Sequence, residues 1–384
     1  MNKSVYLDNS ATTPVAPEVM EAMERYFGRE YGNASSLHAY GRQARKAIEE
    51  SRGKIAESLG VTSKEIVFTS GATEANNLAI KGLAFAHPEK RHVITCKTEH
   101  HAVLHACQWL EQRGSQITYL DVDRFGRVSP EQVAEAIQND TLLVSIMAGN
   151  NEIGTLQPIE RIGTICRERG VFFHTDAVQG YGKIPLPMEV IDLLSVSAHK
   201  LNGPKGVGFL AVRKGVSLTP LFHGGGHEKG RRSTTENTPG IVGLAAAADL
   251  AFREMDATTA RMQQYRQQLI ESVTGISGTR LNGHEKESLP HIVNFSFQAI
   301  EGESLVMKLD ELGFAVSTGS ACSSPNLEPS HVLVAIAVPL TMAHGSLRIS
   351  TGRQTTQEEI DAFLQVLPRA VEQLREISPF KVGA

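Results

Sequence analysis

The chain has 384 residues, more than one compact hydrophobic core usually serves, so we expect two domains that each bury a core of their own. With 38 Lys and Arg residues against 42 Asp and Glu residues, the net charge is −4, which gives no reason to expect nucleic acid or an anionic membrane as a partner. The apolar runs are too short to span a bilayer, and Asp8 precedes any long one, which argues against both a membrane protein and a secretion signal.

Strands and helices alternate along the first two thirds of the chain. Residues 1–15 are predicted to form a short strand and a polar turn, and amphipathic helices are expected at 18–27 and 39–59. The strands expected beyond them lie at 65–69, 92–96, 117–122, 141–148, 171–176, 192–197 and 207–212, with helices at 72–86, 100–113, 130–138 and 159–169. This repetition predicts an α/β fold with a mostly parallel sheet covered by helices on both faces.

A smaller α+β domain is expected to follow. An Ala-rich helix at 241–253 closes the large domain, to which we assign residues 14–255. The rest of the chain shows a long polar helix, a strand at 292–297 and helices at 303–312 and 357–377. We assign residues 256–384 to the small domain, together with the N-terminal strand in residues 1–13.

A lysine is predicted at the open end of a buried strand. The apolar run that ends at Ser197 is followed by His199, Lys200 and a Gly-Pro turn, and ligands bind at the carboxyl ends of such strands. An amine held there, partly desolvated, is uncharged often enough to form a Schiff base. A surface lysine in a loop is the simpler explanation for a lone lysine, but an acidic motif upstream favours pyridoxal 5'-phosphate (PLP) chemistry.

That acidic motif is Asp176, at the end of the preceding apolar strand. An unpaired carboxylate there would be costly, and a protonated pyridine nitrogen is a suitable cationic partner. One strand-and-return unit separates Asp176 from Lys200, so both are expected at the same edge of the sheet. A structural Asp that caps the next turn is the alternative.

Other polar motifs also follow strands or precede helices. Residues 70–74, with Thr73, lie between a strand and a helix and suit a phosphate, although an ordinary helix cap would look the same. His100, at the sheet edge, is placed to stack on a cofactor ring and to handle protons, although a capping or exposed histidine would give the same pattern. His101 and His105 lie four residues apart, but no third metal ligand is evident. The glycine-rich loop at 223–237 carries arginines and hydroxyls that suit an anion.

The four cysteines show neither metal-binding nor disulfide-framework spacing, which is typical of reduced thiols in a cytoplasmic protein. Cys322 differs from the others because it stands among small hydroxylated residues and glycine, which predicts an accessible thiol on a loop. Arg348, within an apolar strand, is suited to pair bidentately with a substrate carboxylate.

Taken together, these motifs resemble the NifS/IscS-type cysteine desulfurases, PLP-dependent fold type I enzymes of the class V aminotransferase family, over essentially the whole chain. The matching segments are 6–13, 71–74, 98–100, 150–154, 174–179, 197–200, 223–228 and 319–322. The resemblance implies that Lys200 binds PLP and moves the Cα proton, and that Asp176 pairs with the pyridinium nitrogen. It implies further roles for a larger set: Gln179 at the phenolic oxygen, His100 at the ring, Ala72, Thr73, Ser197 and His199 at the phosphate, Asn151 at both cofactor and substrate, and Arg348 at the substrate.

The same resemblance implies the products of the reaction and the proteins that take part in it. L-cysteine would become L-alanine while its sulfur passes to Cys322 as a persulfide, for iron-sulfur clusters or other sulfur-containing products such as thiolated tRNA. Thr235 would reach the phosphate of a partner subunit in a homodimer with shared active sites, although Thr234 stands where family members often have glycine. An iron-sulfur scaffold is a possible acceptor, but the chain ends soon after the closing helix, whereas members that dock a scaffold often have a longer tail.

Three other functions remain open. An aminotransferase or β-lyase on the same fold would use Lys200 and Asp176 without needing Cys322. A selenocysteine lyase would share nearly every residue. A non-catalytic sulfur-relay scaffold is disfavoured, because such a protein has no physical reason to keep Lys200, Asp176, His100 and Cys322 together.

Overall fold

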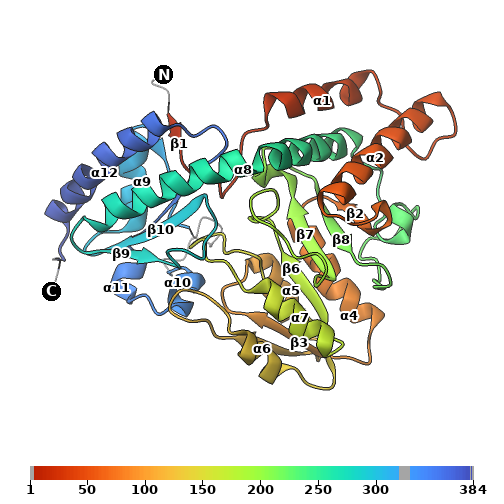
Figure 1. Cartoon of the computed structure of the whole chain (residues 1–384), viewed down its shortest axis with the longest axis horizontal. Helices are drawn as coiled ribbons and strands as arrows, with labels where there is room; N and C mark the ends of the chain where they lie inside the picture. The colour runs from red at the N-terminus through yellow and green to blue at the C-terminus, as the bar shows by residue number, and fades with distance from the viewer. Residues whose placement is uncertain (1–3, 320–328, 381, 383–384) are drawn as a thin grey trace.

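The structure is a computed structural model that describes residues 4–319, 329–380 and 382 (Figure 1). A seven-stranded sheet with the order β2-β8-β7-β6-β5-β3-β4 forms its larger part. The strands are β2 (Ile66–Thr69), β3 (His92–Cys96), β4 (Gln116–Leu120), β5 (Thr141–Ser145), β6 (Phe172–Asp176), β7 (Leu193–Ser197) and β8 (Gly208–Val212). Only β8 runs against the other strands of this sheet, so the predicted mostly parallel α/β sheet is confirmed.

Helices cover both faces of this sheet. They are α1 (Pro17–Gly28), α2 (Ala39–Ser58), α3 (Ala72–Asn77), α4 (Leu83–Ala86), α5 (His101–Glu111), α6 (Pro130–Ala136) and α7 (Ile159–Glu168), with short turns of helix η1 (Ser63–Glu65), η2 (Leu78–Gly82), η3 (Ala198–Lys200) and η4 (Glu228–Gly230). The single helix predicted at 72–86 is thus α3 and α4 joined through η2, whose hydrogen bonding is of the π type.

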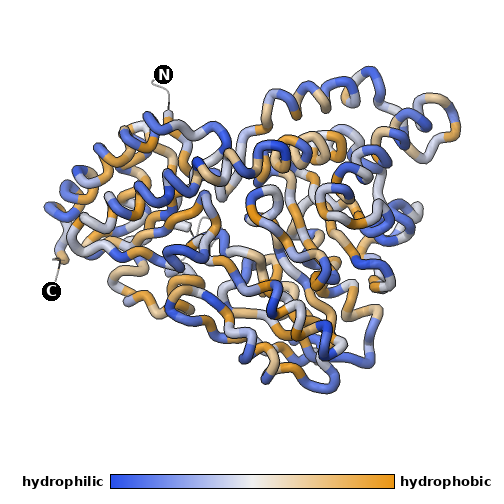
Figure 2. The backbone as a smooth tube through the Cα atoms, viewed as in Figure 1, coloured by the Kyte–Doolittle hydropathy of each residue, from blue (hydrophilic) through white to orange (hydrophobic). Residues whose placement is uncertain are grey.

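Alternate strand residues enter two different cores, as the two-residue period of a strand requires. Val67 and Leu210 pack with α3, α4 and α5 on one face. Phe68 and Phe209 pack on the other face with α1, α2, α6, α7 and the first half of α8 (Thr238–Thr274). Figure 2 shows the apolar residues concentrated along the strands and the polar ones along the outer helices.

The remaining elements build a second core. Strands β9 (Thr279–Asn282), β10 (Ile292–Phe297) and β12 (Ser346–Ser350) form an antiparallel sheet, and β1 (Val5–Tyr6) pairs in parallel with β11 (Phe314–Ala315). Helices α9 (Gly302–Glu311) and α12 (Gln357–Ile377) pack in this core, whereas α10 (His331–Ala335) and α11 (Leu340–Ala343) form a small separate cluster with Ile153. The N-terminal strand therefore lies among C-terminal elements, and Leu7 is buried in their core.

Helix α8 is 37 residues long and runs from one core to the other (Figure 1). Leu244 and Leu250 pack in the core of the large sheet, whereas Tyr265 and Leu269 pack in the second core. No glycine or proline occurs between Leu244 and the end of the helix, so the helix continues without a break past the expected boundary at residue 255.

No helix in the described ranges 4–319, 329–380 and 382 combines the length and the apolar character that crossing a membrane requires.

Candidate active site

A cavity of about 560 Å³ lies at the carboxyl ends of β6 and β7, and its volume is typical of small-molecule sites. Thr235 is exposed and does not line this cavity, and Cys322 lies outside the described residues. The lining includes Ala72, Thr73, His100, Asn151, Asp176, Gln179, Ser197, His199, Lys200 and Arg348. Residues singled out from distant parts of the sequence therefore face one space.

Lys200 ends the short helix η3 that follows β7. Its Nζ donates hydrogen bonds to the main-chain carbonyls of Ser10 at 2.5 Å and Ala11 at 2.7 Å. Its own carbonyl accepts a hydrogen bond from Nζ of Lys183 at 2.9 Å. The N-terminal turn thus holds the amine, and a second lysine holds the backbone that carries it.

Asp176 ends β6 and is 7% exposed. Its Oδ2 accepts a hydrogen bond from Nδ2 of Asn76 at 2.7 Å, and its Oδ1 accepts one from the Val178 amide at 3.0 Å. Both donors are neutral, so they orient the carboxylate without cancelling its charge. The carboxylate can therefore stabilise a cationic group in the cavity.

His100 is the N-cap residue of α5. Its Nδ1 accepts a hydrogen bond from the Ala102 amide at 3.1 Å, which leaves Nε2 as the protonated nitrogen of the neutral ring. Burial lowers the pKa of His100 below its usual 6.5 and the Lys200 charge lowers it further, while Asp176 opposes both. A neutral imidazole that carries its proton on Nε2 can donate to, or stack on, a bound group.

The other side of the cavity suits an anion. Ala72 and Thr73 open the helical segment that begins with α3, where the amides of the first turn lack helical acceptors. A side chain at Gly208 would bring its Cβ within 2.9 Å of the Gly71 Cα, so glycine there lets β8 approach this turn closely. Burial, followed by Lys200, lowers the pKa of His199 to about 4, so its imidazole is neutral at pH 7.

Glu74 ties this anion-binding turn to the loop that carries Thr235. Its Oε2 accepts a hydrogen bond from the Ser70 amide at 2.7 Å, and its carboxylate pairs with both Nε and Nη2 of Arg232 at 2.8 and 3.0 Å. Arg232 stands three residues before Thr235, so a partly buried bidentate ion pair positions the beginning of that segment.

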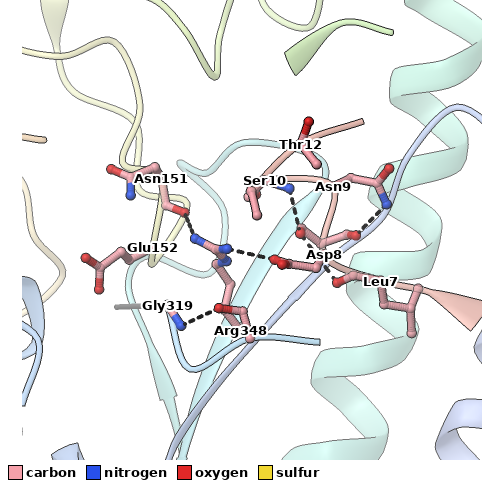
Figure 3. A network of polar contacts seen from close by, with 12 residues as sticks. Leu7, Asp8, Asn9, Ser10, Thr12, Asn151, Glu152, Gly319 and Arg348 are labelled. Carbon is pink, nitrogen blue, oxygen red and sulfur yellow. Dashed lines mark hydrogen bonds and ion pairs between the residues drawn. The ribbon is translucent and has the colours of Figure 1, made fainter. Parts of the chain in front are cut away.

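Arg348 is buried between the N-terminal turn and the segment after β5 (Figure 3). Its Nη2 donates to Oδ1 of Asp8 at 2.8 Å and its Nη1 donates to the Asn151 carbonyl at 3.0 Å. Its Nε has no hydrogen-bond partner within the described part of the chain. Asp8 thus already accepts a hydrogen bond from one of the guanidinium nitrogens that were expected to bind a substrate carboxylate. A substrate carboxylate would compete with Asp8 for this contact.

Comparisons with known proteins show which family this chain matches. The aminotransferase class-V family matches residues 5–363. A protein of Methanosarcina thermophila named "Cysteine desulfurase IscS" is 52% identical over 381 residues, which cover 98% of this chain and 94% of that protein. The chain belongs to the NifS/IscS-type cysteine desulfurases of this family. The predicted resemblance is therefore confirmed.

Solved structures extend this likeness to the fold of the desulfurase. A structure titled "NIFS-LIKE PROTEIN" has a TM-score of 0.91 at 40% identity and covers 97% of this chain and 100% of its own. A structure titled "SspA in complex with cysteine" has a TM-score of 0.81 at 40% identity, covering 90% and 98% of the two chains. The predicted PLP fold type I is confirmed by these neighbours.

Desulfurases of this family depend on PLP, and the donor set of the cavity fits that cofactor. Asp176 offers a carboxylate held by neutral donors, which suits a protonated ring nitrogen, and the turn at Thr73 offers first-turn amides and a hydroxyl, which suit a phosphate. Lys200 lines the same cavity and offers the amine that an aldehyde requires.

Sequence reasoning assigned no role to Glu99, which belongs to the matching segment 98–100. Glu99 directly precedes His100 and is fully buried, and its Oε1 accepts hydrogen bonds from the Met147 amide at 2.7 Å and the Cys96 thiol at 3.4 Å. Burial, followed by the charge of Asp176, raises the pKa of Glu99 to about 8. An acidic residue directly before a candidate histidine was the available signal.

Asn76 and His291, the partners of Asp176 and Gln179, were missed as well. Asn76 sits one turn into the helix that was expected, so helical periodicity could have placed it on the same face as Thr73. Nothing in the sequence around His291 points to Gln179, because Gln179 precedes the long helix α8 in the chain and His291 follows it.

The paired histidines His101 and His105 lie beside a third histidine, His331. The ring of His101 lies 5.0 Å from that of His105 and 4.7 Å from that of His331, between centroids. No group of three potential ligands in residues 4–319, 329–380 and 382 has a geometry that would hold a metal ion.

Proposed function

We propose that this desulfurase converts L-cysteine into L-alanine and takes up the sulfur as a persulfide on Cys322. The observation that carries the proposal is a single cavity that Lys200, Asp176 and Gly319 all line. Gly319 stands three residues before Cys322 in the chain, so amine, carboxylate and the beginning of the cysteine segment meet in one place. The cysteine complex of the SspA neighbour supports this substrate class.

Within this cavity the bound PLP supplies an electron sink for the charge left when the Cα proton is removed. Lys200 holds the cofactor and then takes and returns that proton. Asp176 keeps the ring nitrogen protonated, because its charge is not cancelled by Asn76 or by the Val178 amide. The neutral His100 would stack on the cofactor ring, and its protonated Nε2 would be available to handle protons.

The contacts that orient cofactor and substrate divide between two sides of the cavity. Gln179 would donate to the phenolic oxygen of the cofactor, and Ala72, Thr73, Ser197 and His199 would hold its phosphate. The substrate lies toward Asn151 and Arg348, with its carboxylate on the guanidinium. Because Asp8 already pairs with Arg348, the substrate carboxylate must share or displace that contact.

The sulfur transfer balances without an added oxidant. The Cys322 thiolate attacks the substrate sulfur, the carbon–sulfur bond breaks, and its electron pair stays with the carbon, which gains a proton. One cysteine and one enzyme thiol thus become one alanine and one persulfide. Three other cysteines, Cys96, Cys107 and Cys166, are buried, and burial raises the pKa of each thiol, so they are poor nucleophiles.

The assembly around this chemistry belongs to the same proposal. Two subunits share their active sites, and Thr235, exposed on its loop, reaches the phosphate held by the partner. The small domain comprises residues 1–13 and 256–384, and residues 14–255 form the large PLP-binding domain. The persulfide then serves a sulfur acceptor such as an iron-sulfur scaffold, in the cytoplasm.

The test is the intact mass of the PLP-loaded protein after brief exposure to L-cysteine, with peptide mapping and an alanine assay. One added sulfur on Cys322 together with alanine is expected, and Cys322→Ala should keep the yellow cofactor but lose the added sulfur. Cys107→Ala is the matched control and should keep it. Pyruvate and free sulfide without a persulfide would instead assign the chain to the β-lyases, and a strong preference for selenocysteine would assign it to the selenocysteine lyases.

A further inference from the structure

The side-chain amide of Gln179 is held at both ends. Its Nε2 donates to the main-chain carbonyl of Ser10 at 3.0 Å, and its Oε1 lies 3.1 Å from Nε2 of His291. A carbonyl oxygen can only accept, so the amide nitrogen must face Ser10 and the amide oxygen must face His291. Nε2 of His291 is therefore the protonated nitrogen of that ring.

The surroundings keep His291 neutral in this tautomer. The residue is 3% exposed, and burial lowers its pKa well below 6.5, helped by the charges of Lys183, Arg348 and Lys200. A neutral imidazole carries one N–H, and here that N–H is committed to Gln179. Its other nitrogen, Nδ1, has no hydrogen-bond partner among the residues that the structure describes.

The three groups come from parts of the chain that are far apart. Ser10 belongs to the N-terminal turn, Gln179 follows β6 of the large sheet, and His291 directly precedes β10 of the small sheet. The Ser10 carbonyl also accepts the hydrogen bond from Nζ of Lys200. The amide of Gln179 and the amine of Lys200 are thus positioned against one common atom.

We propose that His291 is a positioning residue that fixes the amide orientation of Gln179, so that the second N–H of the amide stays directed to the cofactor. A rotated amide would place its oxygen against the Ser10 carbonyl and its NH2 group against the His291 N–H, two unfavourable pairs in a buried site. The proposal deepens the proposed function, because it assumes that Gln179 contacts the phenolic oxygen of PLP.

The first measurement uses the cofactor-free protein and is independent of the proposed function. Nitrogen-15 NMR of the His291 ring should show Nε2 protonated and Nδ1 unprotonated in the wild type. A proton on Nδ1 would overturn the proposal even if the enzyme proved to be an efficient desulfurase. If the same tautomer is found in a protein that releases no alanine from L-cysteine, the His291–Gln179 hydrogen bond is supported. The proposed desulfurase reaction is then refuted, independently of that hydrogen bond.

The second measurement is a pH titration of the visible absorbance of the PLP-loaded protein. A donor to the phenolic oxygen stabilises the negative charge there and lowers the midpoint, so losing it should raise the midpoint by about 0.5 to 1 pH unit. We expect this shift for His291→Leu and Gln179→Ala, no further shift in the double variant, and a midpoint close to wild type for His291→Asn, which keeps a donor. Additive shifts, or no shift in a correctly folded His291→Leu protein, would overturn the proposal.

Discussion

The amino group of Lys183 donates a hydrogen bond to the main-chain carbonyl of Lys200 at 2.9 Å. Burial, followed by the positive charge of Lys200, lowers the pKa of Lys183 from 10.5 to about 7. The folded protein therefore binds fewer protons than the unfolded chain between about pH 7 and pH 10.5, and the Lys183 contribution to stability rises with pH across that interval.

Replacing this lysine should flatten the pH dependence of stability. In Lys183→Met, the free energy of unfolding should rise less between pH 7 and pH 10 than in the wild type, as measured by urea denaturation. Lys64→Met removes an exposed lysine and should leave the wild-type slope unchanged. Identical slopes in Lys183→Met and wild type would show that Lys183 keeps an ordinary pKa.

The contribution of Glu99 to the free energy of unfolding should change with pH in the direction opposite to that of Lys183. Its pKa is raised to about 8, so the folded protein binds an extra proton between about pH 4.5 and pH 8, and its contribution falls as pH rises through that range. Glu99→Gln keeps an oxygen that can accept the Met147 amide hydrogen bond and removes the titration. At pH 8.5 the variant should be spared a loss of up to about 4 kcal/mol that the wild type suffers relative to pH 5.

Urea denaturation across this pH range is the measurement, and Glu135→Gln, at an exposed glutamate, is the control. A wild-type profile parallel to that of Glu99→Gln would contradict a raised pKa at Glu99.

Arg348 and Asp8 form a second testable pair, at 2.8 Å. Arg348→Lys loses the planar fork, so the KM for L-cysteine should rise about 10- to 100-fold, with a smaller change in kcat. Asp8→Asn removes the charge that competes with the substrate carboxylate and should lower KM several-fold. Initial rates of alanine formation over a range of cysteine concentrations measure both effects.

Arg353→Lys is the matched control, because Arg353 pairs with Glu254 and Glu18 instead of with a residue of the site. Unchanged KM values in both Arg348→Lys and Asp8→Asn would remove Arg348 from the substrate contacts.

Stability should depend strongly on the buried pair of Arg52 and Glu228. The two side chains are 5% and 4% exposed, their two hydrogen bonds measure 2.7 and 2.8 Å, and Glu228 also accepts the Phe68 amide. Arg52→Met leaves a buried carboxylate unpaired and should cost about 3 to 5 kcal/mol in the free energy of unfolding.

Adding Glu228→Gln to Arg52→Met should restore part of the loss, because the unpaired charge is then gone. Arg161→Met, which breaks an exposed pair with Glu131, should cost less than about 1 kcal/mol. Equal losses in the buried and exposed variants, measured by urea denaturation, would contradict the role of burial.

Much of the architecture could be predicted from the order of apolar and polar residues. The strands expected at 92–96 and 292–297 have the bounds of β3 and β10, and the helix expected at 357–377 has those of α12. The short helices α10 and α11 and the strand β9 were not predicted, because four or five residues are too few to show a period.

Candidate site residues could be predicted where a chemically reactive side chain stands at or just after the end of a buried strand. Asp176 and Lys200 each follow a buried strand, and chain order alone places such residues at one edge of a parallel sheet. The sequence by itself thus determined the fold class and the family, and it placed the candidate residues Asp176 and Lys200 at strand ends, because local periodicity and motif composition are properties of short segments.

Only the tertiary structure decided which side chains constrain one another. Asp8 is separated from its partner Arg348 by nearly the whole chain, and His291 and its partner Gln179 are more than a hundred residues apart in sequence. Such contacts follow from how two cores pack against each other, and no local pattern encodes them. The protonation states of Glu99, Lys183 and His291 were decided at the same level, because burial and neighbouring charges set a pKa, and both exist only once distant segments have come together.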